Sequence, residues 1–148
     1  MRMVLILALL TLAGVIGAAV YFRSVSMPPE VWDVDPARVT PPASPNFALL
    51  RGAEAPVFDM APEALGLRIE AIALAEGAER IAGDPASGQM TYVLRSRLMG
   101  FPDAVSIRLV PVEGGTRMEI FSRSRFGYSD MGVNGARVAR WSAALSGP

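Results

Sequence analysis

The sequence predicts an α+β fold: a three- or four-stranded antiparallel sheet, covered on one face by two helices, behind an N-terminal transmembrane helix. Three observations lead to this prediction. Apolar and polar residues alternate in successive runs of the second half of the chain, apolar residues recur with helical spacing on either side of those runs, and an uncharged apolar run opens the chain. Because a sheet must bury its apolar face, we expect both helices to cover that face.

The first predicted element is the uncharged run from Met3 to Phe22, which lies between Arg2 and Arg23. A helix of about 20 residues spans about 30 Å, the thickness of a bilayer core. We therefore predict a single-pass membrane anchor, with the N-terminus in the cytoplasm and the domain on the other side of the membrane. The alternative is a signal peptide that is cleaved after the small residues Gly17-Ala18-Ala19.

Residues 24–46 form a predicted tether. This segment holds half of the chain's 12 prolines, and proline disfavours helix interiors and central strands. Trp32 has two possible places: the membrane interface, where indole is favoured, or a packed position on the domain. We expect residues 47–148 to form a single folded domain.

Two helices are predicted in this domain from apolar residues spaced by three or four positions. The first runs over residues 63–76 and ends before Gly77, a residue type that favours helix ends. The second runs over residues 135–145, with Asn134 as the expected N-cap. Their apolar rows are Leu65, Ile69 and Ile72 in the first helix, and Val138, Trp141 and Leu145 in the second.

Strands are predicted where apolar and polar residues alternate. Gly114 and Gly115 give a two-residue turn signal between the last two strands. The hairpin register expected from this turn places Leu109 opposite Ile120, so that apolar residues meet on one face. The predicted strands are residues 89–99, 105–112 and 117–126, with a shorter strand around residues 80–83.

Arginines gather on the opposite side of the predicted sheet from its apolar row. Residues 91–148 carry eight Arg and four acidic residues, whereas residues 24–90 carry four Arg and ten acidic residues. Such a face favours a lipid head group, an anionic envelope polymer or an acidic partner protein. The alternative is a solvated face on which arginine stems cover apolar surface. The arginines expected there are Arg95, Arg97, Arg108, Arg117, Arg123 and Arg125.

The composition excludes several kinds of site. Cys and His are absent, which excludes disulfides, Cys/His zinc sites, Cys nucleophiles and Ser-His-Asp triads. Basic and acidic residues balance at 14 each, which argues against a nucleic-acid partner. We expect a non-enzymatic binding module without a cofactor. The alternative is a hydrolase-like or metal-dependent enzyme, for which Asp103 and Asp130 would have to converge on one cleft.

A glycine-containing run over residues 122–137 joins the last predicted strand to the closing helix. Asp130 lies in this run, and we expect it to accept hydrogen bonds from backbone N–H groups, Arg125 or Arg137. Such bonds would make the run a structural corner, and the alternative is a binding site for an anionic ligand or a partner protein. The residues predicted for that binding site are Arg95, Arg97, Arg123, Arg125, Asp130, Asn134 and Arg137.

The sequence Ser-Arg-Phe-Gly-Tyr-Ser-Asp-Met-Gly-Val-Asn-Gly-Ala-Arg-Val over residues 124–138 resembles the closing signature of the family named domain of unknown function 1499. Pro45-Asn46 and Phe101-Pro102-Asp103 resemble two weaker motifs of that family. Phe47 and Ala104 stand where the family usually has Cys and a second Asp. The resemblance implies association with a bacterial envelope or membrane, here an anchor in the inner membrane with the domain in the periplasm, and no agreed activity. The positions that it carries over are Asn46, Asp103, Ser124, Arg125, Gly127, Asp130, Gly132, Asn134 and Arg137.

Overall fold

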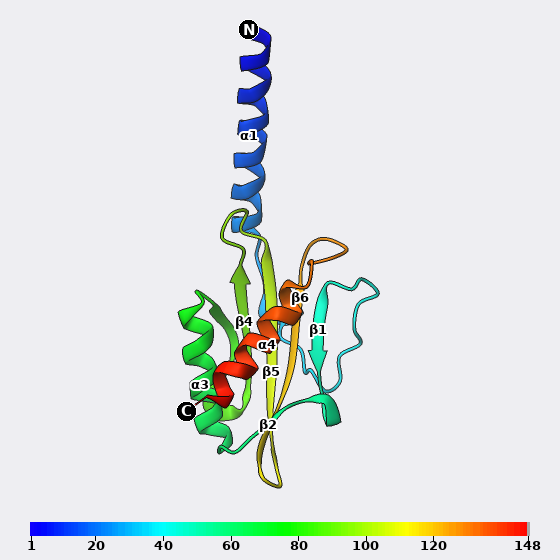
Figure 1. Ribbon diagram of the computed structural model, residues 1–148, viewed down its shortest axis with the longest axis vertical. Coiled ribbons are helices and arrows are strands. Elements are labelled where there is room, and N and C mark those ends of the chain that lie inside the picture. Colours follow the sequence, from blue (N-terminus) through cyan, green and yellow to red (C-terminus); the bar gives the residue numbers. More distant parts are fainter. Residues whose placement is uncertain (148) are drawn as a thin grey trace.

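The computed structural model describes residues 1–147, in which an antiparallel sheet of six strands forms the centre of the fold (Figure 1). The strand order is β1-β6-β5-β4-β3, and β2 pairs with β6 on the same edge as β1. The strands are β1 (Phe47–Leu50), β2 (Val57–Phe58), β3 (Glu79–Asp84), β4 (Gln89–Arg95), β5 (Pro102–Val112) and β6 (Gly115–Ser124). The helices are α1 (Arg2–Ser24), α2 (Pro29–Trp32), α3 (Pro62–Ala75) and α4 (Val133–Ser146).

The predicted α+β class and antiparallel sheet are confirmed, but the sheet has six strands instead of three or four. The two strands that no alternation predicts are β1 and β2. They have four and two residues, which is too short for a period of two to stand out from the surrounding sequence. Both pair with β6, so they extend the sheet on the far side of the β5–β6 hairpin.

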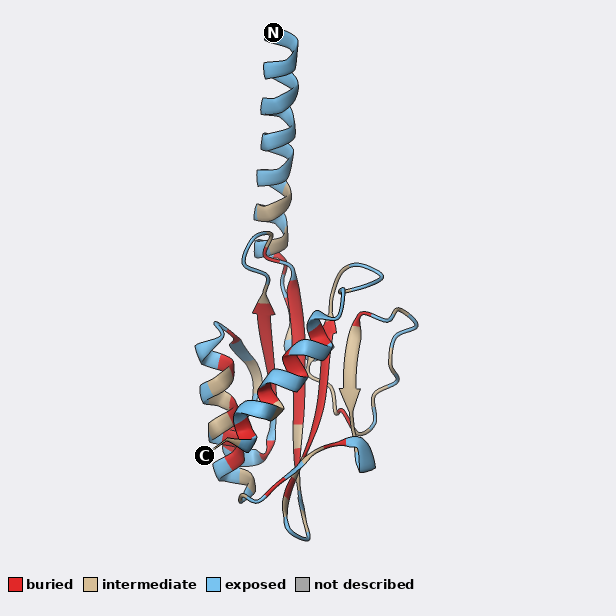
Figure 2. Cartoon of the chain, in the orientation of Figure 1, coloured by how far each residue is buried: buried red, intermediate tan, exposed pale blue. Residues whose placement is uncertain are grey.

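One face of the sheet packs against α3 and α4, as predicted, and Figure 2 marks buried residues along both of these helices. Leu65 and Ile69 of α3 and Trp141 of α4 are fully buried. Each long strand contributes alternate residues to this core, because successive side chains of a strand point to opposite faces. The sheet residues in the core are Met90, Tyr92, Leu94, Val105, Ile107, Leu109, Met118 and Ile120.

The β5–β6 hairpin turns one residue earlier than the sequence predicts, because Val112 pairs with Gly115. Leu109 therefore lies opposite Met118 and not opposite Ile120. The shift amounts to two residues, so it keeps every side chain on its predicted face. Gly115 has a φ of +135°, and a Cβ there would lie 2.0 Å from the carbonyl oxygen of the last β2 residue. Only glycine permits β2 to approach so closely.

The second face of the sheet is covered by residues 25–46. Met27 of this segment packs with Val93 and Ala104 of the sheet, and Trp32 packs against the same cluster. This packing places Trp32 on the domain, one of the two positions that the sequence leaves open, and it lays the predicted tether against the sheet. The prolines fit this arrangement, because proline has no N–H group with which to pair with a strand. A segment rich in proline can therefore lie across the face of a sheet without joining it.

The first helix, α1, has 23 residues, none of them buried, and it is long and apolar enough to cross a membrane. It leaves the domain at the end that carries two loops (Figure 1). One is the β4–β5 loop, residues 96–101, and the other is the β6–α4 loop, residues 125–132. The end of the domain nearest to α1 is therefore built from these two loops.

The last turn of α1 is docked on the domain. The Arg23 guanidinium donates hydrogen bonds to the carbonyl oxygens of Arg97 and Leu98, at 2.9 and 2.8 Å. The ring of Phe22 lies 4.2 Å from that of Phe101, measured between centroids. These contacts hold the β4–β5 loop against α1, so no extended linker separates the helix from the sheet.

Candidate functional site

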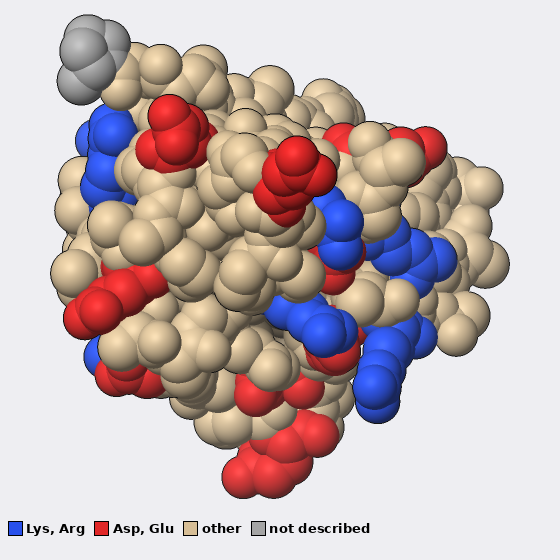
Figure 3. All heavy atoms as spheres, turned by 90° about the horizontal axis from the view of Figure 1, so that it is seen from below, with Lys and Arg blue, Asp and Glu red and all other residues tan. Residues whose placement is uncertain are grey.

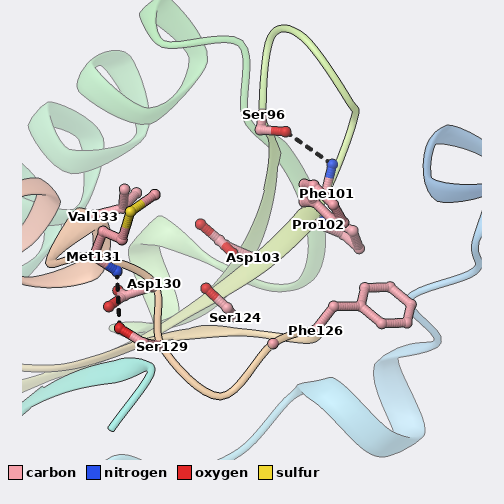
Figure 4. A pocket seen from close by; sticks show the side chains of 11 residues that line it. Ser96, Phe101, Pro102, Asp103, Ser124, Phe126, Ser129, Asp130, Met131 and Val133 are labelled. Atoms are coloured by element: carbon pink, nitrogen blue, oxygen red, sulfur yellow. Dashed lines mark hydrogen bonds between the residues drawn. The ribbon is translucent and has the colours of Figure 1, made fainter. Parts of the chain in front are cut away.

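A pocket of about 350 Å³ lies between the β4–β5 loop and the β6–α4 loop, and we call it the loop pocket (Figure 4). Its apolar side chains come from both loops and from the first residues of β5 and α4, whereas two of its polar side chains come from the ends of β5 and β6. The apolar lining residues are Phe101, Pro102, Phe126, Met131 and Val133. The polar lining side chains are Ser96, Asp103, Ser124, Ser129 and Asp130.

Asp103 and Ser124 lie opposite each other near one end of the β5–β6 ladder. Strand alternation places Asp103 on the same face as Val105 and Ile107, so its carboxylate points to the side that α4 covers. Asp103 is only 8% exposed. A buried carboxylate needs a partner, since an unpaired buried charge is strongly disfavoured.

Arg137 of α4 is that partner. Its Nη2 donates to Oδ2 of Asp103 at 2.8 Å, and its Nη1 donates to Ser122 Oγ and Asn134 Oδ1 at 2.9 and 2.8 Å. Both members of the ion pair are buried. Because Oδ2 is the oxygen that accepts from Arg137, Oδ1 is the oxygen of Asp103 that can accept a further donor.

Asn134 is fully buried and links the two sides of the site. Its Nδ2 donates to Oδ2 of Asp130, to Oγ of Ser124 and to the carbonyl of Asn46, at 2.8, 2.9 and 3.2 Å. The predicted N-cap role of Asn134 is wrong, because α4 begins at Val133 and its N-cap position is the preceding glycine. Asn134 thus lies in the first turn of α4, where its side chain points into the site.

Asp130 accepts hydrogen bonds from the backbone N–H groups of Gly132 and Asn134, at 3.0 and 2.7 Å. The backbone part of its predicted role is confirmed. Its predicted arginine partners are wrong, since Arg137 pairs with Asp103 and Arg125 points elsewhere. Burial alone would raise the pKa of Asp130, but the hydrogen bonds from Asn134 and Gly132 outweigh burial and hold the pKa below its ordinary value.

Asn46, which precedes β1, is hydrogen-bonded to the end of β6 and to the β6–α4 loop. Its Nδ2 donates to the carbonyl oxygen of Gly127 at 2.7 Å, and its own carbonyl oxygen accepts from the backbone of Ser124 at 3.0 Å. Segments far apart in the sequence are therefore joined by one set of hydrogen bonds, which we call the corner network. Its members are Asn46, Asp103, Ser122, Ser124, Asp130, Asn134 and Arg137.

The sequence predicts a role for most members of this network but none for Ser122. Ser122 donates to Oδ1 of Asn134 at 2.5 Å and is fully buried. The alternation of side chains along the strands nevertheless contains a signal for Ser122. Asp103, Ser122 and Ser124 occupy positions that the period of two assigns to the core face, and polar residues there predict a buried polar cluster.

Arg123, by contrast, lies on the second face of the sheet, outside the loop pocket. Its guanidinium donates to the carbonyl oxygen of Trp32 and to Oγ of Ser106, and it lies between the rings of Phe121 and Trp32, 4.5 and 5.4 Å from their centroids. Burial lowers the pKa of Arg123 to about 10, against a smaller opposing effect of Asp33. Arg123 thus holds the covering segment in place.

The remaining predicted arginines also lie outside the loop pocket. Arg95 and Arg125 donate to main-chain carbonyl oxygens of residues 22–26, which form the end of α1 and the chain just after it. Such bonds satisfy carbonyl groups that a helix end leaves free. Arg97 is exposed in the β4–β5 loop. The arginine-rich face is therefore largely occupied by the protein's own chain.

Asp103 and Asp130 both line the loop pocket, as the enzyme alternative requires. Each carboxylate is already engaged, Asp103 by Arg137 and Asp130 by the N-terminal turn of α4. Among residues 1–147, no group of three or more acidic side chains converges on a position that a metal ion would occupy.

Comparison with known families gives one match. Residues 20–145 match the family described as "Protein of unknown function (DUF1499)". This chain belongs to the DUF1499 family. A search of curated proteins and a search of solved structures each found no match.

The extent of the DUF1499 match agrees with the packing of the chain. The match begins at residue 20, in the last turns of α1, so most of that helix lies outside it. Residues 25–46, which cover the second face of the sheet, lie inside it. The description of DUF1499 names no activity, and the loop pocket is the part of the structure that bears on function.

Proposed function

We propose that this protein is a membrane-anchored, non-enzymatic binding module whose loop pocket holds a small amphiphile with an apolar body and an uncharged polar head. The supporting observation is the combination of apolar walls with two available hydrogen-bonding atoms. Oγ of Ser124 accepts from Asn134, so its O–H is left to donate, and Oδ1 of Asp103 is left to accept. A hydroxyl or amide head group matches this pair, because it both donates and accepts.

An uncharged head group fits the loop pocket better than the anionic ligand that the sequence suggests. Two carboxylates line the pocket, and the charge of Arg137 is already shared with Asp103 and the corner network. An anionic head would meet the carboxylates of Asp103 and Asp130 at short range, where like charges repel. Arg123 and Arg125 donate hydrogen bonds to the main-chain carbonyl oxygens of residues 32 and 26, and neither arginine lines the pocket.

The enzyme alternative has one observation in its favour, which is that Asp103 and Asp130 line the same pocket. Hydrogen bonds hold the pKa of Asp130 below its ordinary value, so it is ionised at neutral pH and is a poor general acid and a weak base. If Asp130→Asn stays folded but loses a hydrolytic activity of the purified chain, the enzyme alternative replaces our proposal.

We also propose that α1 spans the bacterial inner membrane once and stays uncleaved, with the domain in the periplasm. The uncharged length of α1 supports a span, and Arg2 with the terminal amine supports an N-terminus in the cytoplasm. Because the chain has no Cys, Val57→Cys gives a unique label site. A membrane-impermeant maleimide should label it in intact spheroplasts. An intact mass that lacks residues 1–19 would show cleavage instead.

Photolabelling of the full chain in phosphatidylcholine liposomes tests the ligand. The probe is a long-chain alcohol that carries a diazirine beside its hydroxyl group. We expect label on the tryptic peptides of residues 98–108 and 126–137, which contain the two loops. Val133→Trp should fill the pocket and abolish that label. The matched control is Val57→Trp, because Val133 and Val57 are 49% and 50% exposed and Val57 lies in β2, away from the pocket.

Two outcomes would contradict the proposal. Equal labelling of the wild type and Val133→Trp would show that the probe does not occupy the pocket. Stronger labelling by a probe of the same chain length with a phosphate head would overturn the uncharged head group and restore the anionic ligand predicted from the sequence.

A further inference from the structure

Five apolar side chains stand exposed on the two loops beside the exit of α1 and at the start of α4. Leu98, Tyr128 and Met131 are 83%, 75% and 93% exposed. Single exposed apolar residues are ordinary, but several of them gathered at one end of a domain mark an interaction surface. We call this group the apolar rim. Its members are Leu98, Phe101, Tyr128, Met131 and Val133.

Aromatic rings join the apolar rim to α1. Phe22 of α1 lies 4.2 Å from Phe101 and 5.1 Å from Phe126, between ring centroids, and Tyr21 lies 6.5 Å from Phe126. Tyr and Trp gather where a membrane-spanning helix leaves the hydrocarbon. Tyr21 marks that level on α1, and the packed rings place the rim residue Phe101 beside it.

The charge around the rim also suits a bilayer surface. Arg23 and Arg97 are exposed at this end, and residues 96–101 contain no acidic side chain. Asp130 is the acidic residue of the β6–α4 loop, and its carboxylate is hydrogen-bonded to α4. The opposite end of the molecule differs, since acidic and basic side chains are interspersed there (Figure 3). Exposed arginines beside an apolar surface favour lipid phosphates.

The length of α1 determines where its last turn lies in the bilayer. Its 23 residues rise about 35 Å, against about 30 Å for a hydrocarbon core. The last turn therefore emerges in the head-group layer, and that turn is fixed to the β4–β5 loop by Arg23 and Phe22. We infer that the apolar rim is embedded in the head-group layer of the bilayer that α1 spans. The loop pocket then opens to lipid and exchanges its ligand with the bilayer. This inference rests on the proposed membrane span.

Spin labelling of the full chain in liposomes tests the inference. The chain has no Cys, so each substitution creates a unique site for a nitroxide label. Leu98→Cys and Tyr128→Cys report on the rim, Val57→Cys reports on the domain away from it, and Leu12→Cys reports on the middle of α1. The liposomes contain phosphatidylcholine and phosphatidylglycerol at about three to one. The measurement compares collision of each label with oxygen, which prefers lipid, and with a water-soluble nickel chelate.

We expect labels at positions 98 and 128 to favour oxygen over the nickel chelate at least threefold more than the label at position 57. We expect position 12 to exceed them all. If positions 98 and 128 match position 57 while position 12 is in lipid, the rim is in water and the inference fails, although the span stands. If position 12 is also in water, the span and the inference fail together. Neither result bears on the ligand, which Val133→Trp tests separately.

Discussion

Asn134→Ala should destabilise the fold more than any exposed substitution on the same helix. The Asn134 side chain is fully buried and connects Asn46, Ser124 and Asp130 on one side with Ser122 and Arg137 on the other. Alanine keeps the helix and removes all five of these hydrogen bonds. The substitution therefore tests the contribution of the corner network to stability without disrupting the helix.

The expected size follows from these bonds. A buried hydrogen bond contributes about 1 kcal/mol, and one to a charged group contributes about 1.5–3 kcal/mol. The partners retain other contacts, since Ser122 and Arg137 still bond each other and Arg137 still bonds Asp103. Water from the loop pocket can reach Asp130. We therefore expect a loss of about 3–4 kcal/mol in the free energy of unfolding, or roughly 10–15 °C in Tm for a domain of this size.

Tryptophan fluorescence of the full chain in detergent micelles measures this loss. Trp32 and Trp141 are the two tryptophans, and they lie on opposite faces of the sheet, so the signal reports on the domain and not on α1. The control is Arg140→Ala, which removes an exposed ion pair with Glu76 and should cost at most about 1 kcal/mol. Equal midpoints in urea for Asn134→Ala and Arg140→Ala would refute the reasoning.

Three further predictions concern other parts of the molecule. Gly115→Ala should lower the free energy of unfolding, measured in urea, by about 2 kcal/mol or more beyond the loss for Gly114→Ala. Both glycines have positive φ, but only at 115 would a Cβ meet the backbone of Phe58, and equal losses would contradict this. Arg123→Met should raise hydrogen exchange in residues 25–46 but not in α4, because it frees the carbonyl that Arg123 holds; unchanged exchange would show that the segment does not depend on it. The pKa of Asp130 is lower in the folded chain than its unfolded value near 3.8, so its stabilisation is complete above about pH 4 and is lost as pH falls further. The difference in urea midpoint between wild type and Asp130→Asn should therefore shrink as the pH falls below about 4, and a constant difference would contradict the assignment.

The strands and helices that the sequence predicts are those with a long periodic pattern. Met90, Tyr92 and Leu94 alternate cleanly in β4, and the row that ends at Trp141 and Leu145 predicts the buried side of α4. Local patterns of this kind depend on neighbouring residues, so they can be read without knowing what packs against them. For β1, four residues give too little pattern, and its place depends on pairing with β6.

The covering of the second face could not be predicted for a different reason. Prolines in residues 24–46 disfavour helix interiors and central strands, but they do not indicate where the segment lies. The bond that fixes it joins Arg123 to the carbonyl of Trp32, 91 positions away. Arginines at alternate strand positions look the same in sequence whether they face solvent or the protein's own chain. Much of the predicted arginine face is therefore a surface against which the protein's own chain packs.

The loop pocket was partly predictable. The run over residues 122–137 identified one wall and most of the corner network, including Asp130 and Arg137. The other wall comes from the β4–β5 loop, and the junction of that loop with α1 depends on Phe22 and Arg23, which the sequence assigns only to a membrane anchor. A contact between an anchor and a domain leaves no periodic signal.

Native mass spectrometry of the full chain, extracted from its membrane in a mild detergent, tests the central claim most directly. Wild type, Val133→Trp and the matched control Val57→Trp are compared, and the mass released on collisional activation identifies what each chain carried. We expect a small uncharged amphiphile on the wild type and the control, and its loss from Val133→Trp. A bare wild-type chain, or the same adduct on all three, would contradict a ligand in the loop pocket.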